Sequence, residues 1–245
     1  MSLTGNISFD GRSSASFNLF VTAYPNYQKP QRKMDVYSVP GRNGDIVHVQ
    51  DAWNDVQQEY HIATLTGTAD SVPTDLTAIA AWLYQPKGYC VLRDDFDATH
   101  FRKAYFAGPF DVENSLGRSG EATIDFTCKP QRYRDDGQTL QTVSISGATV
   151  NNPTAYNARP ILKVYGDSSG GTVTVNGTVF SISSITLPII IDCEEMNCYD
   201  ENGNNKNNIV TSSTSEFATL SPGQNVISFT GSVSSVKVTP NYWDL

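Results

Sequence analysis

The chain has 245 residues and a formal net charge of −8, from 17 basic and 25 acidic side chains. This length favours two domains of roughly 100 to 135 residues each. The acidic balance excludes a general affinity for nucleic-acid phosphates or anionic membranes. Charged residues are only 17% of the chain, and short runs rich in Val, Ile, Thr, Tyr and Phe recur between Gly, Asn and Pro. That pattern predicts a mainly β protein.

No targeting or membrane segment is expected. The chain begins Met1-Ser2-Leu3-Thr4-Gly5, without a basic stretch followed by an apolar one, and no run approaches the ~18 apolar residues of a membrane span. We therefore expect a soluble protein that no standard signal exports. The four cysteines, Cys90, Cys128, Cys193 and Cys198, are too few for a disulfide scaffold, so we expect mostly buried thiols.

The first half combines strands with one helix. Residues 57–68 alternate in character, which predicts a half-buried strand. Ser71 or Thr74 can cap a helix that follows, and Pro86 and Gly88 end it. Its apolar side chains recur at helical spacing and form one stripe. They are Leu76, Ile79, Ala80 and Leu83.

Three strands are predicted after this helix, at residues 89–92, 104–110 and 121–128, as consecutive antiparallel neighbours. Proline, charge and glycine interrupt the pattern at 129–137, which places a domain boundary near residue 135. We thus predict an N-terminal β-rich domain with one α-helix at 1–135 and a second domain at 136–245.

The second domain reads as a β-sandwich, because short β segments alternate with turn signals such as Asn176-Gly177 and Asn202-Gly203. The predicted strands are 140–146, 160–165, 171–180, 185–192, 208–212, 225–230 and 233–239.

One segment is similar to the nucleophile loop of a serine protease. It is Gly166-Asp167-Ser168-Ser169-Gly170-Gly171, which carries one serine more than that motif. The extra residue would shift the nucleophile and the oxyanion-hole N–H groups, and His48, His61 and His100 lack the expected context. We therefore predict a Gly/Ser-rich loop between strands, and no catalytic residue is assigned.

Metal and cofactor sites also lack support. The acidic groups Asp94-Asp95-Phe96-Asp97 and 192–202 have carboxylates but not the spacing of a calcium loop, so solvated turns are favoured. The second group comprises Asp192, Glu194, Glu195, Asp200, Glu201 and Asn202. Cys193 and Cys198 have no second cysteine pair or nearby histidine to complete a zinc site. No phosphate-binding glycine loop is present, and we assign no metal and no cofactor.

Aromatic residues are 11% of the chain, enough for large interfaces or a sugar-stacking surface. We expect most of them in the core. The prominent ones are Tyr24, Tyr27, Tyr37, Trp53, Tyr60, Trp82, Tyr84, Tyr242 and Trp243.

The order of several motifs resembles the distal tail protein (Dit) family of siphophages, the long non-contractile tailed phages. In the first half these are Trp82-Leu83 at a helix end, an acidic turn at Asp94-Asp95, Tyr105-Phe106 on an aromatic strand, and Phe126-Thr127-Cys128-Lys129-Pro130. Other resembling segments are LTG near the N-terminus, the glycine-rich turn 40–44, and residues 157–166, 176–177 and 191–194.

This resemblance implies an N-terminal ring-forming domain at 1–135 and a C-terminal galectin-like β-sandwich at 136–245. It implies a structural, non-enzymatic virion protein, made in the host cytoplasm, that forms a homohexameric ring at the tail tip. The ring would join the tail tube protein to the tail-associated lysin or fibre hub, contact receptor-binding proteins in some phages, and leave a channel for DNA. The interface residues are not assigned by sequence.

The alternative is a carbohydrate-binding module that recognises a host cell-wall saccharide through exposed Tyr or Trp of the second domain. A galectin-like fold does not carry galectin chemistry by itself, since no histidine follows His100. A hydrolase with Ser168 as nucleophile is a distant third.

Overall fold

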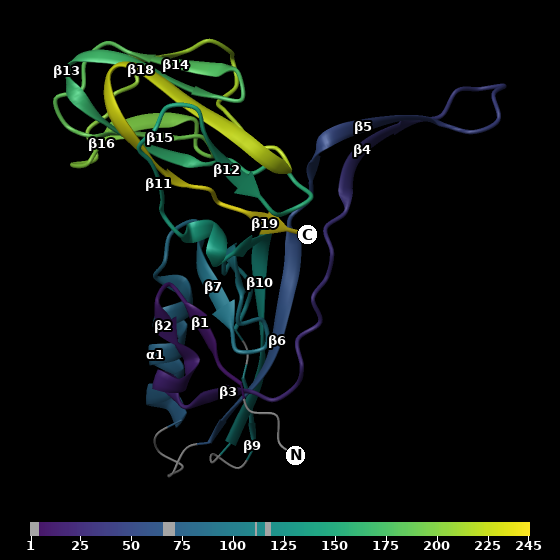
Figure 1. Cartoon of the computed structure of the whole chain (residues 1–245). Helices are drawn as coiled ribbons and strands as arrows, with labels where there is room; N and C mark the ends of the chain where they lie inside the picture. The colour runs from purple at the N-terminus through teal and green to yellow at the C-terminus, as the bar shows by residue number, and fades with distance from the viewer. Residues whose placement is uncertain (1–4, 66–71, 111, 116–118) are drawn as a thin grey trace. The chain divides into compact units, whose positions relative to one another are not determined.

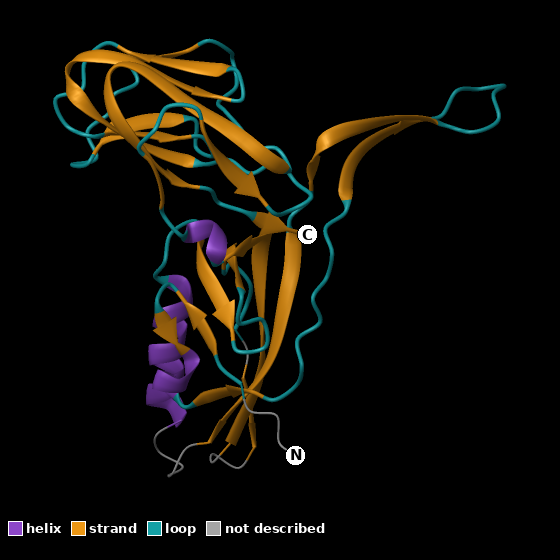
Figure 2. Ribbon diagram, viewed as in Figure 1, coloured by secondary structure: helices purple, strands orange, loops and turns teal. Residues whose placement is uncertain are grey.

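The computed structural model describes residues 5–65, 72–110, 112–115 and 119–245. The chain divides into two compact units: residues up to Arg132 together with Leu245, and Tyr133–Asp244. Strands dominate both, which confirms the mainly β prediction (Figures 1 and 2). Among the described residues, α1 (Val72–Tyr84) is the one α-helix.

The main sheet of the first unit runs in the order β2-β1-β7-β8-β10-β6-β3, with β9 also pairing with β10. Gly5, just before β1, exchanges backbone hydrogen bonds of 3.5 and 2.8 Å with Val21 of β3, so the β1 side of the sheet meets its β3 end. The sheet is therefore curled into a closed layer. Its strands are β1 (Ile7–Phe9), β2 (Arg12–Ser13), β3 (Leu19–Val21), β6 (Val56–Leu65), β7 (Cys90–Asp94), β8 (His100–Tyr105), β9 (Val112–Ser115) and β10 (Ser119–Arg134).

The helix packs its apolar stripe against this sheet. Ile79, Trp82 and Leu83 are buried in one cluster with strand residues such as Phe9 and Phe126. The Trp82 indole N–H donates to the Phe9 carbonyl at 3.0 Å, which satisfies the polar atom of a side chain that is otherwise wholly apolar. This cluster is the core of the first unit.

Two details of the helix and strand predictions need correction. The helix already begins at Val72, so Thr74 lies inside it and is not its cap, while Ser71 lies outside the described residues. The strand predicted at 104–110 is β8, His100–Tyr105. It starts earlier because its residues pair with β7, with Leu92 opposite Arg102. The predicted antiparallel neighbours β7, β8 and β10 are confirmed in that order.

The second unit is built on two long strands, β13 (Ile161–Val175) and β18 (Gly223–Thr239), which pair with each other along their length (Figure 1). At one end they are flanked by β11 (Gln141–Val143), β15 (Ile189–Asp192) and β16 (Asn197–Asp200). At the other end they are flanked by β12 (Ala148–Asn152), β14 (Thr178–Ile182) and β17 (Val210–Ser212). A last short strand, β19 (Trp243–Asp244), pairs with β10, and the Arg134 N–H donates to the Tyr242 carbonyl.

The two ends of this strand pair enclose a single core. Leu162 and Val236 from one end and Val173 and Ile227 from the other belong to the same buried cluster. One continuous pair of strands thus contributes to two facing layers, which is how a strand that changes sheets builds a sandwich corner.

Glycines mark the point where the strands pass between layers. Register shifts fall between Tyr165 and Gly166 and between Gly166 and Gly171. Gly231 has φ +70°, and a Cβ there would lie 2.8 Å from the Gly171 Cα. The predicted separate strands 160–165 and 171–180 are therefore wrong, because the Gly/Ser segment is a bulge inside β13 rather than a loop. For the same reason 225–230 and 233–239 form one strand, β18.

Three strands of this unit were not predicted, β12, β16 and β19. The first two contain asparagine, which disfavours strands by propensity, yet β12 is held by pairing with β18 and β16 by pairing with β15. The Asn176-Gly177 turn is confirmed between β13 and β14, with φ of 48° and 90°.

We predict that Gly231→Ala destabilises the protein more than Gly177→Ala. Both glycines have positive φ, but a Cβ at Gly177 meets nothing within 4 Å. Gly177→Ala is expected to cost about 1 kcal/mol of unfolding free energy from backbone strain alone. Gly231→Ala is expected to cost about 3 kcal/mol, because strain and backbone overlap add. Urea unfolding followed by circular dichroism measures both, and equal costs would contradict the role of close packing.

Candidate assembly interface

A hairpin in the first unit pairs with no other described strand. It consists of β4 (Arg32–Tyr37) and β5 (Ile46–Trp53), which form a two-stranded sheet of their own. Most of its side chains are exposed on both faces. Isolated two-stranded hairpins are marginal in water, so this one needs further contacts.

The register gives the hairpin one apolar face. Met34 lies opposite Val49, and Val36 lies opposite Val47, so these four side chains share a face. They are between 46% and 55% exposed. We call these four residues the apolar face of the hairpin. Contiguous apolar side chains left in water mark interaction sites in soluble proteins.

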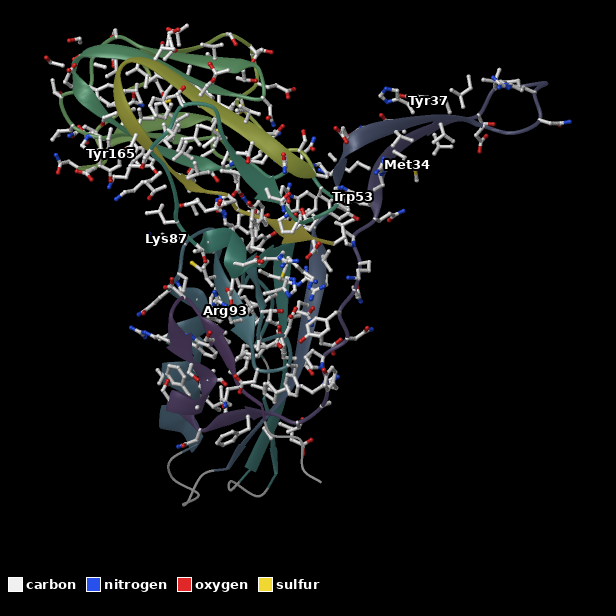
Figure 3. All side chains as sticks on the ribbon, viewed as in Figure 1. Met34, Tyr37, Trp53, Lys87, Arg93 and Tyr165 are labelled. Carbon is white, nitrogen blue, oxygen red and sulfur yellow. The ribbon has the colours of Figure 1, made fainter. Side chains whose placement is uncertain are left out.

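The opposite face is mixed in character. The Gln50 amide donates to the Asp35 carboxylate at 2.9 Å, and the His48 ring lies 3.6 Å from the same carboxylate. Tyr37 and Ile46 lie beyond them on this face. Figure 3 shows Tyr37 and Met34 pointing to opposite sides of the hairpin. The hairpin thus has one apolar face and one mixed face, which is the pattern of a strand pair that buries one side.

Contacts at the base join the two arms of the hairpin. The Arg32 guanidinium lies over the Trp53 ring at 4.6 Å, and the Asn54 N–H donates to the Gln31 carbonyl at 2.9 Å. Figure 3 labels Trp53 at this base. After Asn54 the chain continues into β6, a strand of the main sheet. The glycine-rich turn at 40–44 lies at the far end, where Gly41 and Gly44 have positive φ.

The segment before β4 is held by the acidic turn Asp94–Asp97. The Tyr27 hydroxyl donates to Asp94 Oδ1 at 2.6 Å, and the Tyr60 hydroxyl donates to Asp94 Oδ2 at 2.8 Å. The Tyr24 ring meets the Phe96 ring edge-on at 5.0 Å. Burial and the bond to Asp94 raise the pKa of Tyr27, so its hydroxyl keeps its proton.

The other carboxylate of this turn also has protein partners. Asp97 Oδ1 lies 2.9 Å from the His100 ring, and Asp97 Oδ2 binds the Arg132 guanidinium. Burial by itself would raise the pKa of Asp97, but hydrogen bonds from Arg132 and His100 outweigh it and lower the pKa. These contacts stabilise the turn. Across the residues that the structure describes, no group of three or more His, Cys, Asp or Glu is placed to hold a metal.

The acidic residues 192–202 cap turns in the second unit. Asp192 accepts from the N–H groups of Glu194 and Glu195, at 2.9 and 3.0 Å. Asp200 is buried and accepts from Asn202 and Asn204. Side-chain hydrogen bonding from Asn204 is the main cause that lowers the pKa of Asp200 to about 2. The prediction of solvated turns is therefore wrong for Asp192 and Asp200, which are buried acceptors.

Ser168 is exposed within the β13 bulge, and the Asp167 carboxylate beside it accepts from the Ser169 N–H at 3.0 Å. The three histidines belong to the first unit, whereas Ser168 belongs to the second. The four cysteines are free thiols, and three of them are buried, as predicted. Burial raises the pKa of Cys198 to about 11, which disfavours the thiolate.

The expectation that most of the prominent aromatic residues fill the core is wrong for this set. Of the nine, Tyr60, Trp82 and Tyr242 are buried. Tyr24, Tyr37 and Tyr84 are more than half exposed, and the other three are half-buried. Tyrosine combines an apolar ring with a polar hydroxyl, so it tolerates the surface and is enriched at interfaces.

Sequence reasoning left the interface unassigned, although the hairpin carries a signal. Apolar residues alternate at 34–36 and 47–49, and Pro40-Gly41 and Asn43-Gly44 between them are turn dipeptides. What sequence could not supply was the absence of a covering element among the described parts of the chain.

No family model and no curated protein sequence matches the chain. Solved structures do. The crystal structure of the Dit protein of phage SPP1, described as a paradigm of the hub adsorption apparatus in phages that infect Gram-positive bacteria, has a TM-score of 0.75 and 12% identity over 98% of this chain and 99% of that one. Chains of the phage P2 baseplate in its activated conformation match with a TM-score of 0.56. The form with Ca has 11% identity and the form with Sr 12%, each over 96% of this chain and 97% of theirs.

The chain therefore has the fold of a phage hub and baseplate protein over nearly its whole length, as the resemblance predicted. Within the described part, no helix is long and apolar enough to cross a membrane.

We predict that the apolar face contributes little to the stability of the isolated chain. Val36→Ser combined with Val47→Ser is expected to change the unfolding free energy by less than about 0.5 kcal/mol per site, because both side chains are already half in water. Val21→Ala, at a fully buried position of the same unit, is expected to cost about 2 kcal/mol. Chemical denaturation measures both, and a large loss from the serine variants would show that the face is covered within the chain.

A second prediction concerns acid. Asp200 has a lowered pKa, so its contribution to stability is present above the unfolded value of about 3.9 and is lost as the pH falls toward about 2. Asp200→Asn should remove this part of the pH dependence between those values. Glu216→Gln, which alters an exposed carboxylate of the same unit, is the control. Unfolding midpoints in urea at several pH values test this, and an unchanged slope in Asp200→Asn would refute it.

Proposed function

We propose that this protein is a structural hub of a phage tail tip, a distal tail protein that assembles into a homohexameric ring. The observation that carries the proposal is the match of the whole chain, both units included, to the SPP1 Dit protein. A match confined to one unit would fit many proteins that share a β-sandwich, whereas the combination of both units in one chain is far more restrictive.

The apolar face of the hairpin supports assembly. An apolar face that no described part of the chain covers is stabilised when it is buried against another molecule. A ring closes through one repeated heterologous contact, in which one patch of each copy meets a different patch of the next. The hairpin suits the role of one such patch, because its apolar side chains are contiguous and its two arms are joined at the base by Arg32–Trp53 and Gln31–Asn54 contacts.

The proposal assigns no catalytic step. Ser168 lies on an exposed bulge, and the acidic side chains with the strongest protein contacts, Asp94, Asp97 and Asp200, serve as acceptors within turns. The buried cysteines are held as thiols. The proposed role of these side chains is therefore to stabilise the fold and not to catalyse a reaction.

In the assembled virion the ring would join the tail tube protein to the tail-associated lysin or fibre hub, with receptor-binding proteins as further partners. Its channel would pass DNA, and the net charge of −8 suits a conduit that must not retain a polyanion. Synthesis in the bacterial cytoplasm precedes assembly.

The alternative, a saccharide-binding second unit, has less support. Of its tryptophan and tyrosine rings, Trp243 stacks on Tyr156 with centroids 4.6 Å apart, and Tyr242 is buried. Those ring faces are used within the unit rather than offered to a sugar. A glycan array with the purified protein distinguishes the two functions.

The test of the proposal is the absolute mass of the purified protein by light scattering over a concentration series, with negative-stain images of the same samples. Rings of six are expected. Val36→Lys combined with Val47→Lys places charge on the apolar face and is expected to give monomers with an unchanged circular dichroism spectrum.

Ile145→Lys is the matched control, because Ile145 is an exposed apolar side chain outside the hairpin. This variant should still form rings. A wild-type protein that stays monomeric at every concentration, and also with purified tail tube protein added, would contradict the proposed function.

A further inference from the structure

Arg102 is a buried cation without a counter-ion in contact. It lies on β8, on the same face of the strand as the core residue Ala104. Its side chain is only 6% exposed. Its two terminal nitrogens, Nη1 and Nη2, are inaccessible to solvent and have no hydrogen-bond partner among the residues that the structure describes. A buried guanidinium left in this state is costly, so the structure calls for an occupant that accepts its N–H groups.

A small cavity adjoins this side chain. Its volume is ≈ 10 Å³, and Tyr27, Tyr60, Leu92, Asp94, Phe101 and Arg102 are among the residues that line it. This is room for one water molecule or one ion of similar size. A polyatomic ligand such as phosphate does not fit.

The nearby carboxylates are bonded to other donors. Asp94 Oδ1 accepts from the Tyr27 hydroxyl and from the N–H groups of Phe96 and Asp97, and Asp94 Oδ2 accepts from the Tyr60 hydroxyl. The carboxylate of Asp97 is engaged by His100 and Arg132.

We infer that this cavity is a binding site for a single monatomic anion, with chloride as the physiological occupant. A water molecule would accept from Arg102 but carries no charge to offset the buried guanidinium. A halide accepts only, and it supplies the negative charge that the buried guanidinium lacks.

The charges around Arg102 favour an anion in this cavity. Burial lowers the pKa of Arg102, and the neighbouring Arg132 guanidinium acts in the same direction. Arg132 itself has a buried Nε without a hydrogen-bond partner. Arg132 does not line the cavity, so of these two guanidinium groups Arg102 supplies the donors that face it. The cavity also borders Tyr27, which holds the segment that leads to the hairpin.

The first experiment is a crystal of the full chain soaked in bromide, with anomalous scattering recorded at the bromine edge. A peak in the cavity within hydrogen-bond distance of the Arg102 guanidinium is expected. Density for water without an anomalous signal would overturn the inference, and so would a rotated Arg102 that pairs with a carboxylate.

The second experiment is thermal unfolding of the full chain in chloride and in gluconate at equal ionic strength. The midpoint is expected to rise by several degrees in chloride, because the anion binds only the folded state. Arg102→Met removes the buried charge while keeping an unbranched side chain, and it should lose this chloride-dependent shift yet remain folded in gluconate.

Arg42→Met is the control, since it removes a cation from an exposed part of the chain and should keep the full shift. A chloride effect of equal size in Arg102→Met would overturn the inference. A bromide peak without any chloride-dependent shift in solution would also overturn it, as binding at crystal concentration only.

Discussion

Both units depend on one long antiparallel strand pair, because a buried backbone must find hydrogen-bond partners for its N–H and C=O groups. In the first unit β10 pairs with β6 over ten consecutive positions, from Ser119 opposite Leu65 to Cys128 opposite Val56. In the second unit β13 and β18 serve the same purpose. The shorter strands, several of only two to five residues, pair either with these or with one another.

The two pairs solve the problem of enclosing a core differently. The first sheet curls until its β1 side meets its β3 end at Gly5 and Val21, and one helix adds Trp82 to the enclosed cluster. The second pair bends at a bulge where glycines let two backbones approach closely, so that one pair of strands supplies both layers. The same glycine and serine residues that resemble a protease loop are thus explained by backbone geometry.

The hairpin is not stabilised by a larger sheet. Among the described strands, β4 and β5 pair with each other alone, and one face of the pair is apolar and exposed. The chain continues from β5 into β6 of the first sheet, and the segment before β4 is bonded to the Asp94–Asp97 turn through Tyr27. An element that is held at its base and has an exposed apolar face suits a protein whose partners arrive by assembly, which links the packing of the monomer to the proposed ring.

The sequence by itself determined the elements whose pattern is local: the helix with Ile79 and Leu83 on one stripe, the alternating strand that carries Tyr60 and Ile62, and the Asn176-Gly177 turn. Its motif order also predicted the fold that the solved structures share.

The sequence could not show that residues 166–171 lie within a single strand, because the bulge is set by pairing with β18, about sixty residues away. Nor could it show that Arg102 lines a cavity while Asp94 accepts from Tyr27 and Tyr60, or that the apolar face of the hairpin stays exposed. These features arise from contacts between residues far apart in the chain, and only the tertiary structure decides which donors, acceptors and apolar surfaces are left without a partner.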